Sequence, residues 1–157
     1  MRTKLVCLWL LLLSAPAFSQ AVVKSDAKHP KTVIKDRAAK LKLMGAHRLS
    51  LQWISWDYFG RATVTERAGT LFLTGEQKAR KGSDNLKIDG VITEVSAKEF
   101  NFKGKIIIKV EANNKGKPCE RNGEMTFRIT NNRRYWRLKE MENPCEEIVD
   151  YVDIYFR

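Results

Sequence analysis

The sequence predicts an all-β domain of eight short antiparallel strands that close into an up-and-down barrel. Apolar and polar residues alternate with a period of two from Gly45 onwards, and turn residues separate the alternating runs at hairpin-length intervals. No convincing helical period interrupts these runs. Closure removes the exposed edges that an open sheet would keep. A two-sheet β-sandwich has the same spacing of strands and turns, and it is the alternative.

The first 19 residues have the order of a secretory signal peptide. Positive charge at Arg2 and Lys4 precedes the apolar run 5–13, and small residues follow as far as Ser19. The run is too short to be a stable transmembrane anchor. We therefore expect cleavage after Ser19, a secreted or periplasmic location, and a mature chain that begins at Gln20.

Residues 20–44 are expected to form a basic, partly helical or disordered arm ahead of one β-barrel domain at 45–157. Apolar residues from Val33 to Met44 recur at steps of three and four after Pro30, which permits a short amphipathic helix. Two interpretations stay open: a leader that lies over the barrel mouth, or an arm that docks on an anionic membrane surface. Without Arg2 and Lys4 the chain has 27 basic and 18 acidic residues, and this formal charge of +9 favours anionic partners.

The strands follow in order from the alternation and the turns between them. We expect strands at 48–53, 61–66, 70–77, 86–92 and 100–108, two more in a hairpin between the cysteines of the mature chain, and a last one at 148–156. Glycines at 75, 90 and 104 lie within or at the ends of strands, where a closing barrel needs bends or bulges. In strand count the chain resembles the calycin-like barrels, but it lacks the G-x-W signature of the lipocalin branch, and this likeness implies no function.

The segment from Cys119 to Cys145 predicts a β-hairpin closed by a disulfide. Asn131-Asn132 suits a two-residue turn because Asn tolerates positive φ, and a turn there places Phe127 opposite Trp136. That register gathers on one face the apolar residues Met125, Phe127, Ile129, Trp136 and Leu138. It also brings the two cysteines together at the open end of the hairpin. Cys7 leaves with the signal peptide, so an exported chain pairs Cys119 with Cys145.

The other face of this hairpin is the first candidate binding surface. Its basic and aromatic residues are Arg128, Arg133, Arg134, Tyr135, Arg137 and Lys139. Arginine beside an aromatic ring holds phosphate or carboxylate through forked hydrogen bonds, or stacks on a ring. We expect a loop to extend this surface into an anion-binding rim through Lys78, Arg80 and Lys81. The competing interpretation is a solvated strand face that simply carries the charge of a basic protein.

The second candidate surface is the aromatic corner between the first two predicted strands. It contains Trp53, Trp56, Tyr58 and Phe59. These rings either plug one end of the barrel or line a site for an apolar ligand.

The sequence shows no pattern typical of catalysis or metal binding. His29 and His47 lack metal-ligand spacing, and we find no nucleophile elbow, P-loop or dinucleotide fingerprint. Asp150 and Asp153 are an odd number of residues apart, so they lie on opposite sides of a strand. Asp150 shares the apolar side and needs a buried partner, for which the candidates are Arg121 and Arg134. We expect no cofactor and no metal.

These features predict a secreted or periplasmic binding protein without enzymatic activity. The expected partner is an anionic or amphiphilic small molecule, an envelope polymer or a protein, held by the basic aromatic face or the barrel mouth; nothing favours nucleic acid. One alternative is a hydrolase of envelope or extracellular polymers that uses carboxylates such as Asp57 and Asp150. It would need the two carboxylates about 5 to 10 Å apart in an open cleft. The other alternative is a purely structural envelope component.

Overall fold

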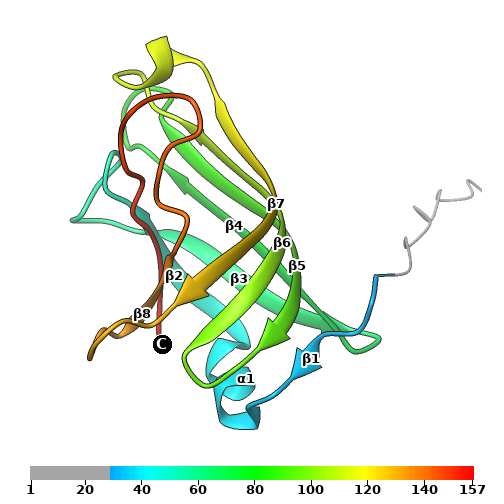
Figure 1. The fold of residues 1–157 in the computed structure, drawn as a ribbon. Coiled ribbons are helices and arrows are strands. Elements are labelled where there is room, and N and C mark those ends of the chain that lie inside the picture. The colour runs from blue at the N-terminus through cyan, green and yellow to red at the C-terminus, as the bar shows by residue number, and fades with distance from the viewer. Residues whose placement is uncertain (1–28) are drawn as a thin grey trace, which may run out of the picture.

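The computed structural model of the chain describes residues 29–157. The predicted signal peptide, with its cleavage site and Cys7, and the first part of the basic arm lie outside the described residues. Eight antiparallel strands form a closed barrel, to whose wall one further short strand is added (Figure 1). The predicted up-and-down barrel is confirmed, and the sandwich is not adopted, because each barrel strand pairs with a neighbour on both sides.

The barrel strands are joined by turns and loops in simple chain order. The elements are β1 (Val33–Ile34), α1 (Arg37–Leu43), β2 (Gly45–Leu51), β3 (Gly60–Arg67), β4 (Thr70–Lys78), β5 (Asn85–Val95), β6 (Glu99–Lys109), the 3₁₀ turn η1 (Asn114–Gly116), β7 (Cys119–Arg128), β8 (Tyr135–Leu138) and β9 (Val152–Tyr155). From β2 to β9 each strand pairs antiparallel with the next, and β9 returns to pair with β2. β1, which the alternation does not predict, pairs in parallel with the end of β5.

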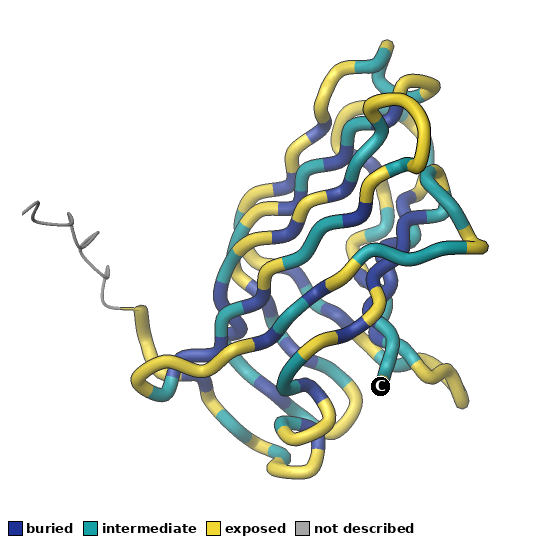
Figure 2. The backbone as a smooth tube through the Cα atoms, turned by 180° about the vertical axis from the view of Figure 1, so that it is seen from behind, coloured by how far each residue is buried: buried dark blue, intermediate teal, exposed yellow. Residues whose placement is uncertain are grey.

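Alternation along the strands fills the barrel interior with apolar side chains. In Figure 2 buried and exposed residues follow one another along the strands, as a half-buried sheet requires. The inward residues form a single apolar cluster, in which the rings of Phe100 and Phe127 stack with centroids 5.0 Å apart. An eight-stranded barrel is just wide enough for side chains to fill, so the outer wall is left to carry polar and charged groups.

Helix α1 lies at one end of the barrel, below the strands in Figure 1. Asp36 caps the helix by accepting a hydrogen bond from the backbone nitrogen of Ala39 at 2.7 Å. Ala39 and Leu43 are buried in the core, whereas Leu41 points to solvent. The carbonyl of Leu43 also lies 2.7 Å from Nε2 of the buried His47. The helix that the sequence permits is therefore packed against the barrel rather than free.

Three glycines lie in one row across the neighbouring strands β5, β6 and β7. Gly90 is the register partner of Gly104, which is in turn the partner of Gly123. A Cβ atom at Gly90 would lie 2.6 Å from the Cα of Gly104 and 2.8 Å from the ring of Phe102. Gly123 has a φ of 131°, which side chains rarely permit. The row lets the Phe102 ring lie directly against the backbone of the wall.

The predicted register of the β7–β8 hairpin is wrong by two residues. Phe127 lies opposite Leu138 instead of Trp136. Because the shift is even, each side chain still points to the predicted side. Phe127, Trp136 and Leu138 are buried, as expected for the apolar face.

The register shift arises because residues beside the turn form backbone hydrogen bonds with other parts of the barrel. Asn131 does adopt a positive φ of 54°, as a turn there requires. However, the backbone nitrogen of Ile129 donates to Lys98, and the carbonyl of Arg134 accepts from Phe156. Closure of the barrel supplies these partners, so the two strands begin their own ladder further from the turn than an isolated hairpin would.

The disulfide between Cys119 and Cys145 is confirmed, with an S–S distance of 2.04 Å and a Cα–Cα distance of 6.0 Å. It joins the start of β7 to the loop between β8 and β9, at the barrel end away from α1. The last strand is shorter than predicted, because the segment before Val152 folds back on this loop. Asp150 donates its backbone N–H to Met141, which takes it out of the β9 ladder.

Replacing both cysteines with alanine should lower the free energy of unfolding by about 3 to 4 kcal/mol. The bond closes a loop whose ends are 26 residues apart, and a loop of this length restricts the unfolded chain by about that amount. Urea unfolding of the oxidised wild type and of C119A/C145A measures the difference. Reduced wild type is the matched control and should resemble the variant; a change below about 1 kcal/mol would contradict the stabilising role.

Candidate functional site

A shallow basic groove lies on the outer wall where β7 and β8 meet. Its volume is about 330 Å³. We call it the hairpin groove, and its lining residues are Arg128, Thr130, Arg133, Arg137, Leu138, Lys139, Met141 and Tyr151. The structure thus brings together four of the basic residues that the sequence analysis proposed as a binding surface.

Two arginines of the hairpin groove stand directly opposite each other. Arg128 on β7 is the register partner of Arg137 on β8. Like charges in this position destabilise a sheet unless they are neutralised. Each guanidinium has one acidic partner: Nε of Arg128 donates to Glu99 at 2.6 Å, and Arg137 is paired with Asp153. These two acids hold the opposed arginines in place.

The Arg137–Asp153 pair is the most buried ionic contact of the groove. Nε of Arg137 donates to Oδ1 of Asp153 and Nη2 donates to Oδ2, both at 2.7 Å. The Asp153 side chain is fully buried although it lies on the outer side of β9, and its register partner Ser50 is buried as well. Two parallel hydrogen bonds fix the plane of the guanidinium. Arg137 therefore meets a ligand in a preset orientation.

Burial raises the pKa of the Asp153 carboxyl above its ordinary value of 3.8, and the hydrogen bonds from Arg137 oppose that rise. The same hydrogen bonds raise the pKa of Arg137, so its guanidinium stays charged.

Two cations of the groove have no acidic partner within residues 29–157. They are Arg133, in the turn, and Lys139, just after β8. The guanidinium carbon of Arg133 lies 5.5 Å from the ring centroid of Tyr135, and that of Arg137 lies 4.2 Å from the ring centroid of Tyr151. Cation–π attraction restrains Arg133 without neutralising it. The groove thus keeps unneutralised positive charge next to rigid aromatic rings.

The loop that contains Lys78, Arg80 and Lys81 is not joined to the hairpin groove. It follows the end of β4, at the barrel end where β7 starts, whereas Arg128 is the last residue of β7. Ten residues of strand separate the two ends by roughly 30 Å. Arg80 instead stacks on Tyr58 at 4.4 Å from the ring centroid. Arg134, in the β7–β8 turn, is also outside the groove lining.

The aromatic corner between β2 and β3 neither fills the barrel nor lines the hairpin groove. Trp56 is 52% exposed and Trp53 is 39% exposed. The indole nitrogen of Trp53 donates to Oδ1 of Asp150 at 2.9 Å, so this ring lies over a buried polar group. Tyr58 is occupied by its contacts with the loop after β4.

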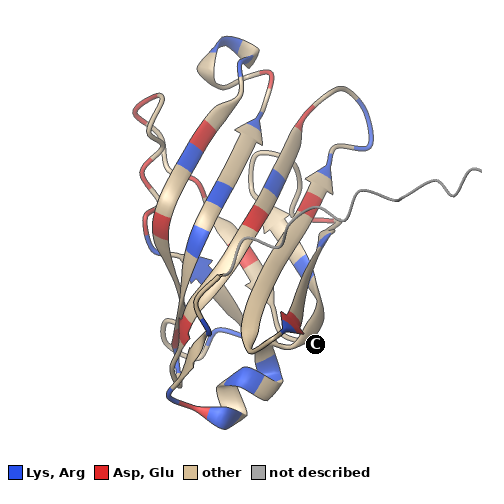
Figure 3. Cartoon of the chain, turned by 90° about the vertical axis from the view of Figure 1, so that its right-hand side faces the viewer, with Lys and Arg blue, Asp and Glu red and all other residues tan. Residues whose placement is uncertain are grey.

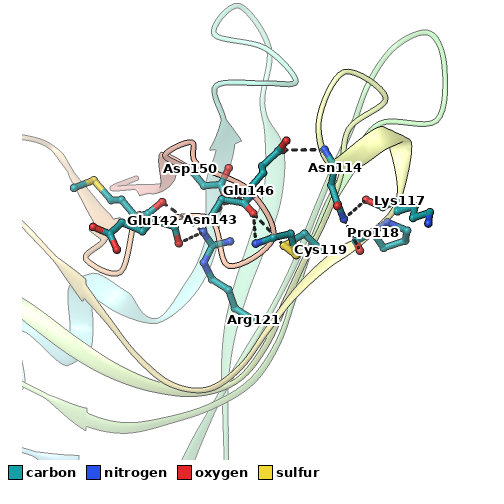
Figure 4. The surroundings of a disulfide bond; sticks show 11 residues. Asn114, Lys117, Pro118, Cys119, Arg121, Glu142, Asn143, Glu146 and Asp150 are labelled. Atoms are coloured by element: carbon teal, nitrogen blue, oxygen red, sulfur yellow. Dashed lines mark hydrogen bonds and ion pairs between the residues drawn. A yellow bond between two sulfur atoms is a disulfide. The ribbon is translucent and has the colours of Figure 1, made fainter.

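Asp150 lies in a buried polar network beside the disulfide (Figure 4). Its Oδ2 accepts from Nη2 of Arg121 at 2.7 Å and from the side-chain nitrogen of Asn143 at 2.9 Å, and its Oδ1 accepts from Trp53. Both Arg121 and Asp150 are buried, which confirms the predicted ion pair. With three donors and no exposure, Asp150 is built as a structural anchor, because a catalytic acid must reach a substrate.

The described part of the chain shows no ready metal centre. Among residues 29–157 no group of three His, Cys, Asp or Glu side chains is arranged to hold a metal ion. No helix in this same part is long and apolar enough to cross a membrane.

Comparison with known proteins places the chain in a family. The model of the PM1083 family matches residues 31–156, which include β1, α1 and the whole barrel. The chain belongs to the PM1083 family. It is 37% identical over 155 residues to a Pasteurella multocida (strain Pm70) protein named "Uncharacterized protein PM1083", and the match covers 99% of this chain and 98% of that relative. No solved structure matched the chain. The relative's name states no activity, so for this PM1083 family member the functional argument rests on the geometry of the site.

Three residues of the hairpin groove or its wall escaped the sequence analysis. Met141 and Tyr151 come from the segment between β8 and β9, whose fold-back before Val152 the predicted strand at 148–156 did not foresee. Asp153 had been assigned to the solvent side of a strand, and only its position opposite Arg137 could have revealed its role. Asp153 lies directly opposite Arg137 in the pairing of β9 with β8, and the register of these two strands is the signal that would have identified it.

Replacing Asp153 with asparagine should remove a pH dependence of stability. The native carboxyl binds its proton more tightly than the unfolded one, because burial raises its pKa. The free energy of unfolding of the wild type should therefore fall, relative to D153N, as the pH rises from 3.8 through the raised native pKa. Urea unfolding of both proteins across the acid range measures this. A difference that stays constant or grows with pH would contradict it.

Proposed function

We propose that the chain is an exported, non-enzymatic binding protein that holds an anionic group in the hairpin groove. One observation carries the proposal: Arg133 and Lys139 lie unneutralised beside Arg137, whose guanidinium is fixed by a buried carboxylate. An anion placed there gains hydrogen bonds to Arg137, which is already oriented, so this side chain loses little entropy on binding. Met141 and Tyr151 add apolar contact, which suits an amphiphilic anion.

The wall that β6 and β7 form beside the hairpin groove supports this proposal by contrast. Figure 3 shows positive and negative residues on neighbouring strands of that wall. There Lys103 pairs with Glu124 at 3.6 Å, and Lys105 pairs with Glu120 at 2.9 Å. The hairpin groove leaves part of its charge free, which favours a ligand.

The proposal also includes export from the cytoplasm. The disulfide between Cys119 and Cys145 forms stably in oxidising compartments, and the sequence of residues 1–19 is typical of a secretory signal. A secreted or periplasmic protein of this kind meets phosphorylated and carboxylated molecules of the envelope. These are the anionic ligands that arginine and lysine recognise best.

The two alternative functions gain less support from the structure. A hydrolase would need a pair of accessible carboxylates, but Asp150 is fully buried and accepts three hydrogen bonds. Asp57 lies exposed in the loop between β2 and β3. A structural envelope component needs no groove with unneutralised charge. This function remains if no anion binds.

Substituting Arg133 and Lys139 together should weaken anion binding in the hairpin groove. Tripolyphosphate is a suitable compact probe, and its binding can be followed by the NMR shifts of the Thr130 and Tyr151 amides, which line the groove. We expect R133Q/K139Q to raise the dissociation constant about tenfold or more, because charge-assisted hydrogen bonds are lost. Wild-type affinity should also fall as salt is added.

The matched control variant is K103Q/K105Q, which removes two lysines of the paired wall and the same formal charge. It should leave the shifts at Thr130 and Tyr151 nearly unchanged. Equal weakening by both variants would mean that only net charge matters, and wild-type protein without any shift at these amides would overturn the proposed function.

The chain isolated from outside the cytoplasm should begin at Gln20 and carry no free thiol. Cleavage after Ser19 removes Cys7 together with the apolar run, and the two remaining cysteines are oxidised. Intact-mass measurement before and after thiol alkylation checks both points at once. Retention of residues 1–19, or alkylation of Cys119 and Cys145 without reduction, would contradict export to an oxidising compartment.

A further inference from the structure

A second basic groove lies on the neighbouring wall of the barrel, between β2 and β3. Its volume is about 680 Å³, and we call it the β2–β3 groove. The residues that matter for its chemistry are Arg48, Phe59, Arg61, Phe156 and Arg157. None of them belongs to the surfaces that the sequence analysis proposed, apart from Phe59 in the aromatic corner.

The β2–β3 groove repeats the charge pattern of the hairpin groove. Arg48 and Arg61 are direct register partners, so two like charges again stand opposite each other. The register partner of Arg61 on its other side is Glu76, but that carboxylate lies 3.1 Å from Lys78 and 3.9 Å from Lys87.

No arginine of the β2–β3 groove has an acidic partner in the described part of the chain. This holds for Arg48, Arg61 and Arg157. Lys42 of α1 adds a fourth cation at the edge, with its nitrogen 4.8 Å from the ring centroid of Phe156. No acid of the described residues offsets the repulsion between these cations, so an external anion would relieve it.

An aromatic bridge connects the two grooves. The rings of Tyr135 on β8 and Tyr155 on β9 lie 5.1 Å apart, and the guanidinium of Arg48 lies 5.4 Å from the Tyr155 ring centroid. The strands β8, β9 and β2 are consecutive in the wall. With about 4.8 Å between strands, Arg137 and Arg48 are roughly 10 to 15 Å apart across the surface. Asp153 lies between them but is buried and already paired with Arg137, so it offers no exposed negative charge.

We propose that the two grooves bind one chain-like anion, which carries repeated phosphate or carboxylate groups and crosses Tyr155 from one groove to the other. This inference rests on the proposed function of the hairpin groove and specifies its ligand. A small anion can occupy one groove at a time. A chain that reaches both gains from the second contact without a new loss of translational freedom, so its affinity rises far above that of either site.

The ring contacts favour an anionic glycan or polyphosphate over nucleic acid. Proteins that hold single-stranded nucleic acids offer open aromatic faces on which bases stack. Here the guanidinium groups of Arg133 and Arg137 both lie within 5.5 Å of the Tyr135 centroid, and Arg48 lies over Phe59 and Tyr155. Because these rings already stack on arginine, they do not offer open faces to bases. They support recognition of charge instead.

The experiment compares tripolyphosphate with long-chain polyphosphate in the full mature protein, by calorimetry and by NMR. The wild type should bind two tripolyphosphates, one at each groove, with separate shifts at the amides of Thr130 and Ala46. Long-chain polyphosphate should bind about a hundredfold more tightly and shift both amides together. A long chain also gains affinity from its many equivalent binding positions, so the variants decide whether two grooves are used.

The deciding variant is R48Q/R61Q, which leaves every residue of the hairpin groove intact. It should keep tripolyphosphate binding at Thr130, lose the shift at Ala46, and weaken long-chain polyphosphate at least tenfold. K103Q/K105Q is again the control with the same charge change, and thermal melting curves verify that each variant is folded.

The outcomes separate the two proposals. If R48Q/R61Q changes the affinity for the long chain less than twofold while R133Q/K139Q weakens it, the second groove is refuted and the proposed function stands. If R133Q/K139Q is also without effect, the proposed function fails as well. Tighter binding of single-stranded DNA than of polyphosphate at equal charge, or binding to phosphatidylglycerol vesicles but not to polyphosphate, would overturn the assignment of the ligand class.

Discussion

The structure depends on the closure of eight strands into a barrel whose interior is just large enough for its own side chains. Closure gives each barrel strand two neighbours and so removes the long open edges of a flat sheet. The same geometry packs Phe100, Phe102 and Phe127 into the interior. The interior is therefore filled by side chains, and strand register decides which charged residues become neighbours on the outer wall.

Register produces the chief electrostatic conflict of the molecule, which is the pairing of arginine with arginine. Arg128 meets Arg137, and Arg48 meets Arg61, at direct cross-strand positions. Acids resolve the first conflict in part, through Glu99 and the buried Asp153. No acid resolves the second within residues 29–157, whereas Lys103 and Lys105 on β6 are each paired with a glutamate on β7. The two grooves thus keep positive charge that no acid of the described residues offsets, and the proposed ligand would use this charge.

The two ends of the barrel have different physical roles. At the disulfide end, Arg121, Asp150 and Asn143 form a buried network that ties the loop between β8 and β9 to β7. Three donors satisfy the Asp150 carboxylate, although Nη1 of Arg121 has no partner among the described residues, so the carboxylate has little capacity left for chemistry. At the other end α1 covers the core and places Lys42 beside the β2–β3 groove. The buried stabilising network thus lies at the barrel end opposite α1.

The sequence alone determined the barrel, the disulfide, the faces of the last hairpin and the need of Asp150 for a buried partner. These follow from local rules: a period of two, the pairing of two cysteines, and the cost of an unpaired buried carboxylate. The tertiary structure decided the register of β7 against β8, the burial of Asp153 and the meeting of Arg48 with Arg61. It also separated Lys78 and its loop from the hairpin arginines, because they lie at opposite ends of the strands. Alternation shows the side of a sheet on which a residue lies, but its neighbour across the strands depends on closure of the whole wall.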